Sequence, residues 1–237
     1  SGSGGGTTPT PPRGPAGDLR SVVLTGPNMG GKSCYVRTAG ILVVLAQMGS
    51  WVPAASATVG TFERILTRMG GEDDLVRGKS TFENELVGVS RMLRGGAGNS
   101  RKTLLLLDEL GRGTSTFDGM AIATATLEHI VTRMECLCYF VTHFPIVTEL
   151  ERRHPGRVAN GHMGYVVEDG TAAGRGADEI VFLFEFRWGV AGGSYGMNVA
   201  RLAGVDPSVL EVASKKAKEA EARAKARRAG SGRTGYK

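Results

Sequence analysis

The chain alternates between short runs of apolar residues and longer stretches in which apolar and polar positions are mixed. The short runs are continuous, as expected of strands buried on both faces of a parallel sheet. These strands are predicted at 21–25, 103–107 and 136–141. The longer stretches predict helices at 32–48, 83–93 and 118–134, the last with Asp118 as its N-cap. Strand and helix therefore alternate, which indicates an α/β fold with a mostly parallel sheet.

The remainder of the chain has a more varied pattern. A short helix with proline in its first turn is expected at 145–153. Residues 163–187 alternate between apolar and polar positions around a Gly-rich centre, which predicts two antiparallel strands. A short helix at 198–203 precedes a longer one, in which Asp206 would be the N-cap and Pro207 the first helical residue. The sheet should therefore gain an antiparallel addition, followed by a helical extension.

Composition changes this picture in two places. The 237 residues include 36 glycines and 9 prolines, and residues 1–19 are rich in both, which predicts a disordered linker or insertion. Glycine does not recur at every third position, so a collagen-like fibre is excluded. Residues 38–62 carry no charge over 25 positions, but polar residues interrupt them. We therefore expect a buried helix followed by an extended segment there, and not a membrane span.

The positive charge is concentrated at one end of the chain. The net charge is +6, and the residues from Asp206 onward, with nine basic and four acidic side chains, account for +5 of it. Such a tail is either a solvated helix or a contact for nucleic acid or an acidic partner, and charge alone favours the solvated helix. Two of the three cysteines, Cys136 and Cys138, lie in an apolar run with no zinc or redox spacing, so buried thiols are expected.

The segment 26–33 carries the strongest chemical signal. It fits the pattern G-x-x-x-x-G-K-[ST] and lies between a predicted strand and a predicted helix. Glycines let backbone N–H groups turn toward phosphate oxygens, and a helix start adds partial positive charge. In such a loop the Lys32 ammonium reaches the β- and γ-phosphates, and the Ser33 hydroxyl is a ligand of Mg²⁺. The predicted nucleotide-binding residues are Gly26, Pro27, Asn28, Met29, Gly30, Gly31, Lys32 and Ser33.

Polar residues follow two other predicted strands. Asp108 and Glu109 end the apolar run that starts at 103, and His143 follows the run that ends at 141. At the carboxyl end of a parallel strand, Asp108 would lie beside the phosphate loop and hold Mg²⁺. Glu109 would orient or deprotonate the attacking water, and His143 would sense phosphate or position that water. If the phosphate loop were absent, Asp108 and Glu109 could be explained as an acidic strand end that faces solvent, and His143 as a surface histidine.

Several segments together resemble the MutS family of DNA mismatch repair ATPases, in the family's order along the chain. The most specific is 108–119, which reads D-E-L-G-R-G-T-S-T-F-D-G. The other matching segments are 25–33, 47–54, 67–70, 80–82, 141–143 and 194–204. The residues at 35–37 and the S-Y-G stretch at 194–196 are more similar to eukaryotic members, and to the branch that recognises insertion–deletion loops.

The resemblance implies a three-layer, ABC-like P-loop NTPase that binds ATP and Mg²⁺ and works as a dimer. Lys32, Glu109 and His143 would be its catalytic residues, and Ser33 with Asp108 would hold the magnesium ion. Ser80 would reach the nucleotide of the partner subunit in trans. The domain organisation would be a linker at 1–19, the ATPase domain at 20–192, and a helical dimerisation extension with a basic tail at 193–237.

The expected partner is a second MutS homologue, identical or different. Mismatched or looped double-stranded DNA would be bound by domains outside this chain. The resemblance also implies a soluble nuclear protein with no membrane contact. One departure from the family pattern is the charged run Glu83-Asn84-Glu85, where the family has two apolar residues before an acid, and it puts charge near the contact in trans. This departure motivates the alternative of a nucleotide-binding interaction fragment with negligible turnover.

Overall fold

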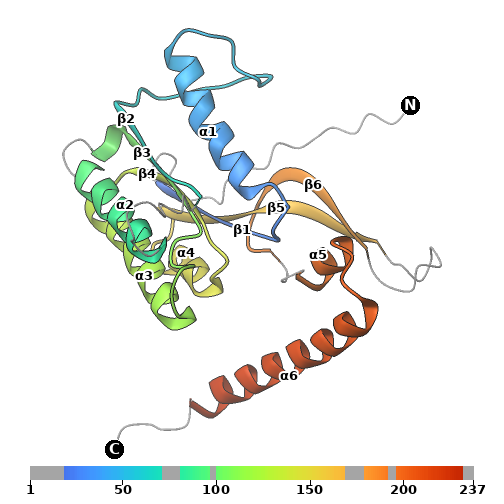
Figure 1. The fold of residues 1–237 in the computed structure, drawn as a ribbon. Coiled ribbons are helices and arrows are strands. Elements are labelled where there is room, and N and C mark those ends of the chain that lie inside the picture. Colours follow the sequence, from blue (N-terminus) through green and yellow to red (C-terminus); the bar gives the residue numbers. More distant parts are fainter. Residues whose placement is uncertain (1–18, 71–80, 97–99, 169–178, 192–195, 232–237) are drawn as a thin grey trace, which may run out of the picture. The chain divides into compact units, whose positions relative to one another are not determined.

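The computed structural model of the chain describes residues 19–70, 81–96, 100–168, 179–191 and 196–231 (Figure 1). The chain divides into two compact units, each described by itself below. The first consists of Ser1–Gly26, Gly30–Tyr165 and Phe182–Gly193. The second consists of Pro27–Met29, Val166–Val181 and Ser194–Lys237.

A six-stranded sheet is the framework of the structure. Its strands are β1 (Ser21–Thr25), β2 (Arg64–Arg68), β3 (Thr103–Asp108), β4 (Leu137–Val141), β5 (Val158–Glu168) and β6 (Glu179–Trp188). They lie in the order β2-β3-β4-β1-β5-β6, and the first five are paired in parallel. Gly161 of β5 lies against Arg187 and Gly164 against Glu185, so β6 runs antiparallel to β5. The predicted α/β class, with a mostly parallel sheet and an antiparallel addition, is confirmed.

Helices cover both faces of the sheet (Figure 1). One face carries α1 (Lys32–Gln47), and the other carries α2 (Thr81–Gly96), α3 (Thr116–His129) and α4 (Leu150–Arg153). Alternate residues of β3 serve the two cores: Leu104 and Leu106 pack with α1, whereas Leu105 and Leu107 pack with α2 and α3. Because both faces of β3 are buried, its sequence is a continuous apolar run instead of an alternating one.

The start and end of α3 differ from the sequence prediction. The N-cap is Ser115 and not Asp118, because the Ser115 hydroxyl oxygen accepts the Asp118 N–H at 3.3 Å. The same hydroxyl donates to the Asp118 carboxylate at 2.8 Å, so the side chain of Asp118 holds the capping hydroxyl in place. At the other end the α-helix stops at His129, and a π-helical turn, Ile130–Met134, completes the stretch that was predicted as one helix.

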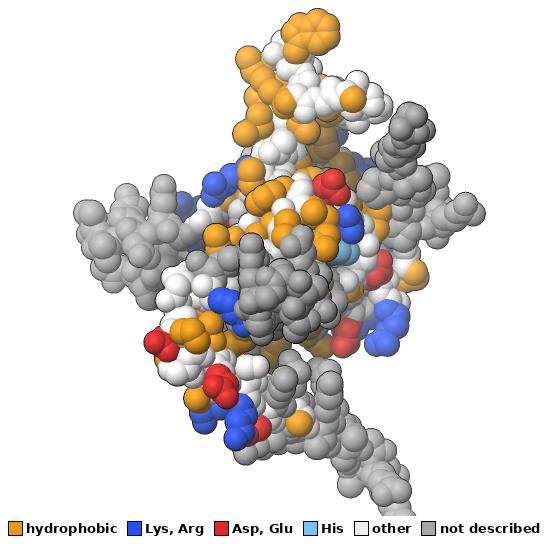
Figure 2. All heavy atoms as spheres, turned by 90° about the vertical axis from the view of Figure 1, so that its right-hand side faces the viewer, with side chains coloured by type: hydrophobic (Ala, Val, Ile, Leu, Met, Phe, Trp, Pro, Cys, Tyr) orange, Lys and Arg blue, Asp and Glu red, His pale blue; other side chains and the backbone are white. Residues whose placement is uncertain are grey.

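Helix α1 is buried on one face only, so the expectation of a buried helix in the uncharged stretch was half right. Val36, Gly40 and Val43 face the sheet, while Ile41 and Val44 are exposed. Trp51, in the segment after the helix, is 96% exposed. Hydrophobic side chains gather at the projecting top of the molecule in Figure 2, where Figure 1 shows the end of α1 and this segment. None of the helices in the described ranges is long and apolar enough to cross a membrane.

The second unit contains the two C-terminal helices, α5 (Gly196–Leu202) and α6 (Pro207–Ser231), which contact each other. The carboxylate of Asp206 accepts the Ser208 N–H at 2.8 Å, and Pro207 is the first helical residue. The predicted start of this helix is therefore confirmed. The domain boundaries at residues 19 and 192 remain predictions.

Candidate functional site

Three neighbouring strands end at one edge of the sheet, and the candidate residues follow directly from these ends. Strand β4 lies between β3 and β1, with Val141 paired to Leu24 on one side and to Asp108 on the other. The three strands are parallel, so their carboxyl ends meet at the same edge. Three groups therefore leave the sheet at the same level: Gly26 of the predicted phosphate loop, the pair beginning at Asp108, and His143.

The predicted phosphate loop has the backbone of an anion-binding turn. Gly26 and Gly31 have φ values of +126° and +92°, and Met29 has +70°. A left-handed residue beside a helix start lets successive N–H groups turn to one side. Gly31 is also the N-cap of α1, and without a side chain it leaves the first N–H groups uncapped. Pro27–Met29 are grouped with the second unit, and the other residues of the loop with the first.

Lys32 is a buried cation that closes this loop. Its side-chain ammonium donates a hydrogen bond to the carbonyl oxygen of Gly26 at 2.9 Å. Burial lowers the pKa of Lys32, and the carboxylates of Glu109 and Asp108 act in the opposite direction. Lys32 is thus held near the two acidic residues at the end of β3, and its positive charge can also bind a polyanionic ligand there.

The Ser33 hydroxyl is hydrogen-bonded to the Asp108 carboxylate. Burial raises the pKa of Asp108, although this hydrogen bond and the nearby Lys32 partly offset the effect. The Oδ1 atom of Asp108 is buried, and no described residue donates a hydrogen bond to it. A buried carboxylate oxygen without a partner, next to a hydroxyl, is a donor set that suits Mg²⁺. These two residues therefore fit the predicted metal site.

Glu109 occupies a conformation that is unusual for a residue with a side chain. Its φ is +53°, which costs about 1–2 kcal/mol in the left-handed region. Its N–H donates to the Val141 carbonyl at 2.9 Å, so the turn is fastened to β4. The carboxylate is mostly buried and pairs with the guanidinium of Arg112 at 2.6 Å. Arg112 was not singled out from the sequence, although it lies in the most specific segment.

His143 lies beside this pair at the end of β4. Its ring is exposed and contacts Phe144, with ring centroids 4.0 Å apart. Partial burial lowers the pKa of His143, and Glu109 opposes this while Arg112 and Lys32 add to it. The side chain is therefore a neutral imidazole at neutral pH. In this form one ring nitrogen can donate a hydrogen bond and the other can accept one.

The structure brings five of the predicted site residues together. Lys32, Ser33, Asp108, Glu109 and His143 gather at the same sheet edge, linked by the contacts and electrostatic effects described above. Ser80, predicted to act in trans, lies outside the described residues.

The charged run Glu83-Asn84-Glu85 lies near the start of α2. The acid at its end, Glu85, is buried and accepts the Gly111 N–H at 2.9 Å. No local pattern indicates this contact, because it joins residues that are 26 positions apart.

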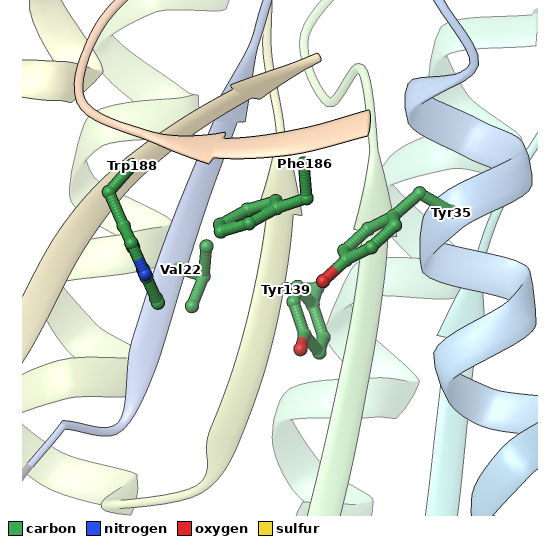
Figure 3. A pocket seen from close by; sticks show the side chains of 5 residues that line it. All are labelled: Val22, Tyr35, Tyr139, Phe186 and Trp188. Atoms are coloured by element: carbon green, nitrogen blue, oxygen red, sulfur yellow. The ribbon is translucent and has the colours of Figure 1, made fainter. Parts of the chain in front are cut away.

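An aromatic hollow lies on the α1 face of the sheet, and none of the charged groups described above lines it. It encloses about 380 Å³ and is lined by Val22, Tyr35, Tyr139, Phe186 and Trp188 (Figure 3). Tyr35 stacks on Phe186 with ring centroids 5.1 Å apart and is hydrogen-bonded to Tyr139. Burial raises the pKa of both tyrosines, so neither titrates near neutral pH. We therefore assign this hollow to packing and not to acid–base chemistry.

Comparison with known proteins gives matches over most of the chain. The family model for MutS domain V matches residues 22–221. The DNA mismatch repair protein Msh3 of Mus musculus is 46% identical over 208 residues, and that of Homo sapiens is 45% identical over 208. Msh3 of Dictyostelium discoideum is 46% identical over 202 residues. These matches cover 84–85% of the chain but only 14–19% of each relative, so the chain spans less than a fifth of the relatives' length.

Proposed function

This chain belongs to the MutS family, as a domain V similar to that of Msh3 proteins, and from this premise we propose that it is the ATP-hydrolysing domain of a mismatch repair protein. The observation that carries the proposal is the pairing of Ser33 with Asp108 next to the Lys32 loop, with the buried Oδ1 of Asp108 receiving no hydrogen bond from the residues that the structure describes. The fold would then be that of an ABC-like P-loop NTPase. The part of the chain that matches the family model would be the ATP-driven motor of a longer protein.

Binding of ATP would use the loop and the start of α1. The uncapped N–H groups of the first turn and the Lys32 ammonium would hold the β- and γ-phosphates. Ser33 and Asp108 would hold the magnesium ion, which when bound neutralises phosphate charge and stabilises the transition state. The present Ser33–Asp108 hydrogen bond keeps the two oxygens side by side for this role.

Hydrolysis would depend on the strand ends beside this loop. Glu109 would accept a proton from the attacking water or orient it, and its ion pair with Arg112 fixes the direction of its carboxylate. His143, neutral at neutral pH, would hydrogen-bond the γ-phosphate or that water. We assign these roles from the position of the residues at the sheet edge together with the family pattern.

The wider assembly is also part of the proposal. A second MutS homologue, identical or different, would complete each site, with Ser80 contributing in trans and residues 193–237 forming the helical clasp. The relatives are named as DNA mismatch repair proteins, so mismatched or looped DNA would be the substrate of the assembly and the nucleus its location. Contacts with that DNA would come from domains outside this chain.

The test is the rate of Mg²⁺-dependent ATP hydrolysis by the 237-residue chain over a range of protein concentrations, together with the Kd for ATP. A rate per chain that increases with concentration supports a site completed by dimerisation. Glu109→Gln should retain ATP binding and lose hydrolysis. ATP binding without hydrolysis at any concentration would instead support the interaction-fragment alternative, and absence of ATP binding would refute both.

A further inference from the structure

The turn that carries Glu109 and Arg112 is held in a tight backbone conformation. Gly111, between them, has a φ of +90°. A Cβ atom added to Gly111 would lie 2.6 Å from the carbonyl oxygen of Gly119 in α3. The turn is therefore pressed against α3 on one side, and no side chain fits between the two backbones.

The start of α2 covers the same turn from another side. A Cβ atom on Gly113 would lie 3.0 Å from the Cβ atom of Phe82, so these two segments are in close contact. Three residues further along α2, the Glu85 carboxylate accepts the N–H of Gly111 at 2.9 Å. Gly111 is itself buried, so this carboxylate satisfies a backbone donor that water does not reach.

The burial of Glu85 calls for an explanation. Among the residues that the structure describes, the buried charged side chains are Lys32 and Glu85. Burying a carboxylate is costly unless it is hydrogen-bonded, and a neutral residue could fill the same volume more cheaply. Lys32 belongs to the candidate site, and Glu85 holds the turn that carries two further charged groups of that site, Glu109 and Arg112.

We propose that Glu85 is a positioning residue for ATP hydrolysis, an inference that rests on the proposed function. By holding the Gly111 N–H, Glu85 fixes the backbone between Glu109 and Arg112 and so the direction of the Glu109 carboxylate. It does not touch the nucleotide. Loss of the contact should therefore reduce the hydrolysis step and leave ATP binding by Lys32 and Ser33 unchanged.

The test compares variants of the full 237-residue chain. Glu85→Ala removes the acceptor, and we expect kcat to fall on the order of 10- to 100-fold with the KM and Kd for ATP within about twofold. Glu85→Gln keeps an oxygen that can accept the N–H, so its kcat should stay within about threefold of the parent. Glu85→Asp keeps the charge but is one methylene too short, and it should behave like Glu85→Ala.

Glu151 supplies a matched control. Its carboxylate, on α4, also accepts a backbone N–H, that of Asn160, at 3.3 Å, and it binds the Asn160 side chain at 2.6 Å. Glu151→Ala removes a comparable contact within the same unit but away from the turn. We expect its Tm to fall about as much as that of Glu85→Ala, while its kcat stays at the parental value.

Each outcome bears on the inference. A kcat for Glu85→Ala equal to that of a parent that hydrolyses ATP overturns the role of Glu85 and leaves the proposed function standing. Equal losses of kcat in Glu85→Ala and Glu151→Ala overturn it as well, because they reveal a general effect of stability. If Glu85→Ala does not fold, a Glu85→Asp variant with parental kcat overturns it. A parent chain that binds ATP without hydrolysing it overturns the proposed function and this role together.

Discussion

The close approach of Gly111 and Gly119 allows two physical effects of opposite sign to be compared in one substitution. Gly119 lies inside α3, where replacement of glycine by alanine normally stabilises a helix by about 1 kcal/mol. A Cβ atom at this position would, however, lie 2.3 Å from the carbonyl oxygen of Gly111 and 3.0 Å from the Phe144 ring. The first contact is with backbone, so α3 and the turn must move apart by several tenths of an ångström.

The steric effect should win in Gly119→Ala. Overpacking of this kind costs about 1–3 kcal/mol, and a rigid backbone contact belongs in the upper part of that range. After subtraction of the helix-propensity gain, we expect the free energy of unfolding to fall by about 1–2 kcal/mol. Because the displaced turn holds Glu109, the kcat for ATP hydrolysis should also fall, with the KM for ATP nearly unchanged.

Gly88 in α2 provides the control. A Cβ atom there would contact the side chain of Arg68, at 3.0 Å from Cδ and 3.2 Å from Nε, and a long side chain can shift. Gly88→Ala should therefore lie between no change and a stabilisation of about 1 kcal/mol. Urea-induced unfolding at 25 °C, followed by circular dichroism, measures both variants against the parent. A Gly119→Ala variant as stable as the parent, or more stable, would refute the steric argument.

Other predictions follow from the same edge of the sheet. Glu109→Gln should bind ATP like the parent and hydrolyse it about 10²- to 10⁴-fold more slowly, as measured in single-turnover experiments; a parental rate would remove Glu109 from catalysis. Because the pKa of His143 is lowered in the folded chain, this histidine is protonated at a higher pH in the unfolded chain than in the folded chain. Stability should therefore decrease as pH falls from 7 to 5, and less so in His143→Gln; equal decreases would contradict this. A thiol reagent should modify Cys34 fast, because this side chain is exposed, and more slowly when Mg-ATP is bound beside it. Cys136 and Cys138 should react slowly, because burial raises the pKa of Cys136 to about 11 and that of Cys138 further. Fast modification of more than one thiol in the folded chain would contradict the burial.

Motifs that depend on neighbouring residues could be read directly from the sequence. The continuous run at 103–107 predicted a strand buried on both faces, and β3 has that character because its leucines serve two cores. The glycines around Lys32 predicted a Gly-rich turn between a strand and a helix, and Gly26 and Gly31 in this turn have positive φ values. In these cases the backbone conformation is set by residues within a few positions, so a local pattern is sufficient.

Local patterns were less reliable where two residues could play the same part. Asp118 and Ser115 are both good N-caps, and the sequence favoured the wrong one. In the structure the Ser115 hydroxyl accepts the Asp118 N–H, so Asp118 is the third residue of the helix and not its cap. The apolar sequence of α1 likewise indicated full burial, but the helix rests on the sheet with one side and leaves Ile41 and Val44 exposed.

The sequence by itself determined the alternation of strands and helices, the Gly-rich turn before α1, the acidic residues at the end of β3 and the family. Tertiary structure alone decided that β4 lies between β3 and β1, which brings Asp108 and His143 to one edge with Lys32. It also decided that Glu85 is buried against Gly111, and that Arg112 turns back to pair with Glu109. The physical reason is that periodicity and capping act over a few residues, whereas strand order and buried hydrogen bonds depend on the packing of segments that are distant in the chain.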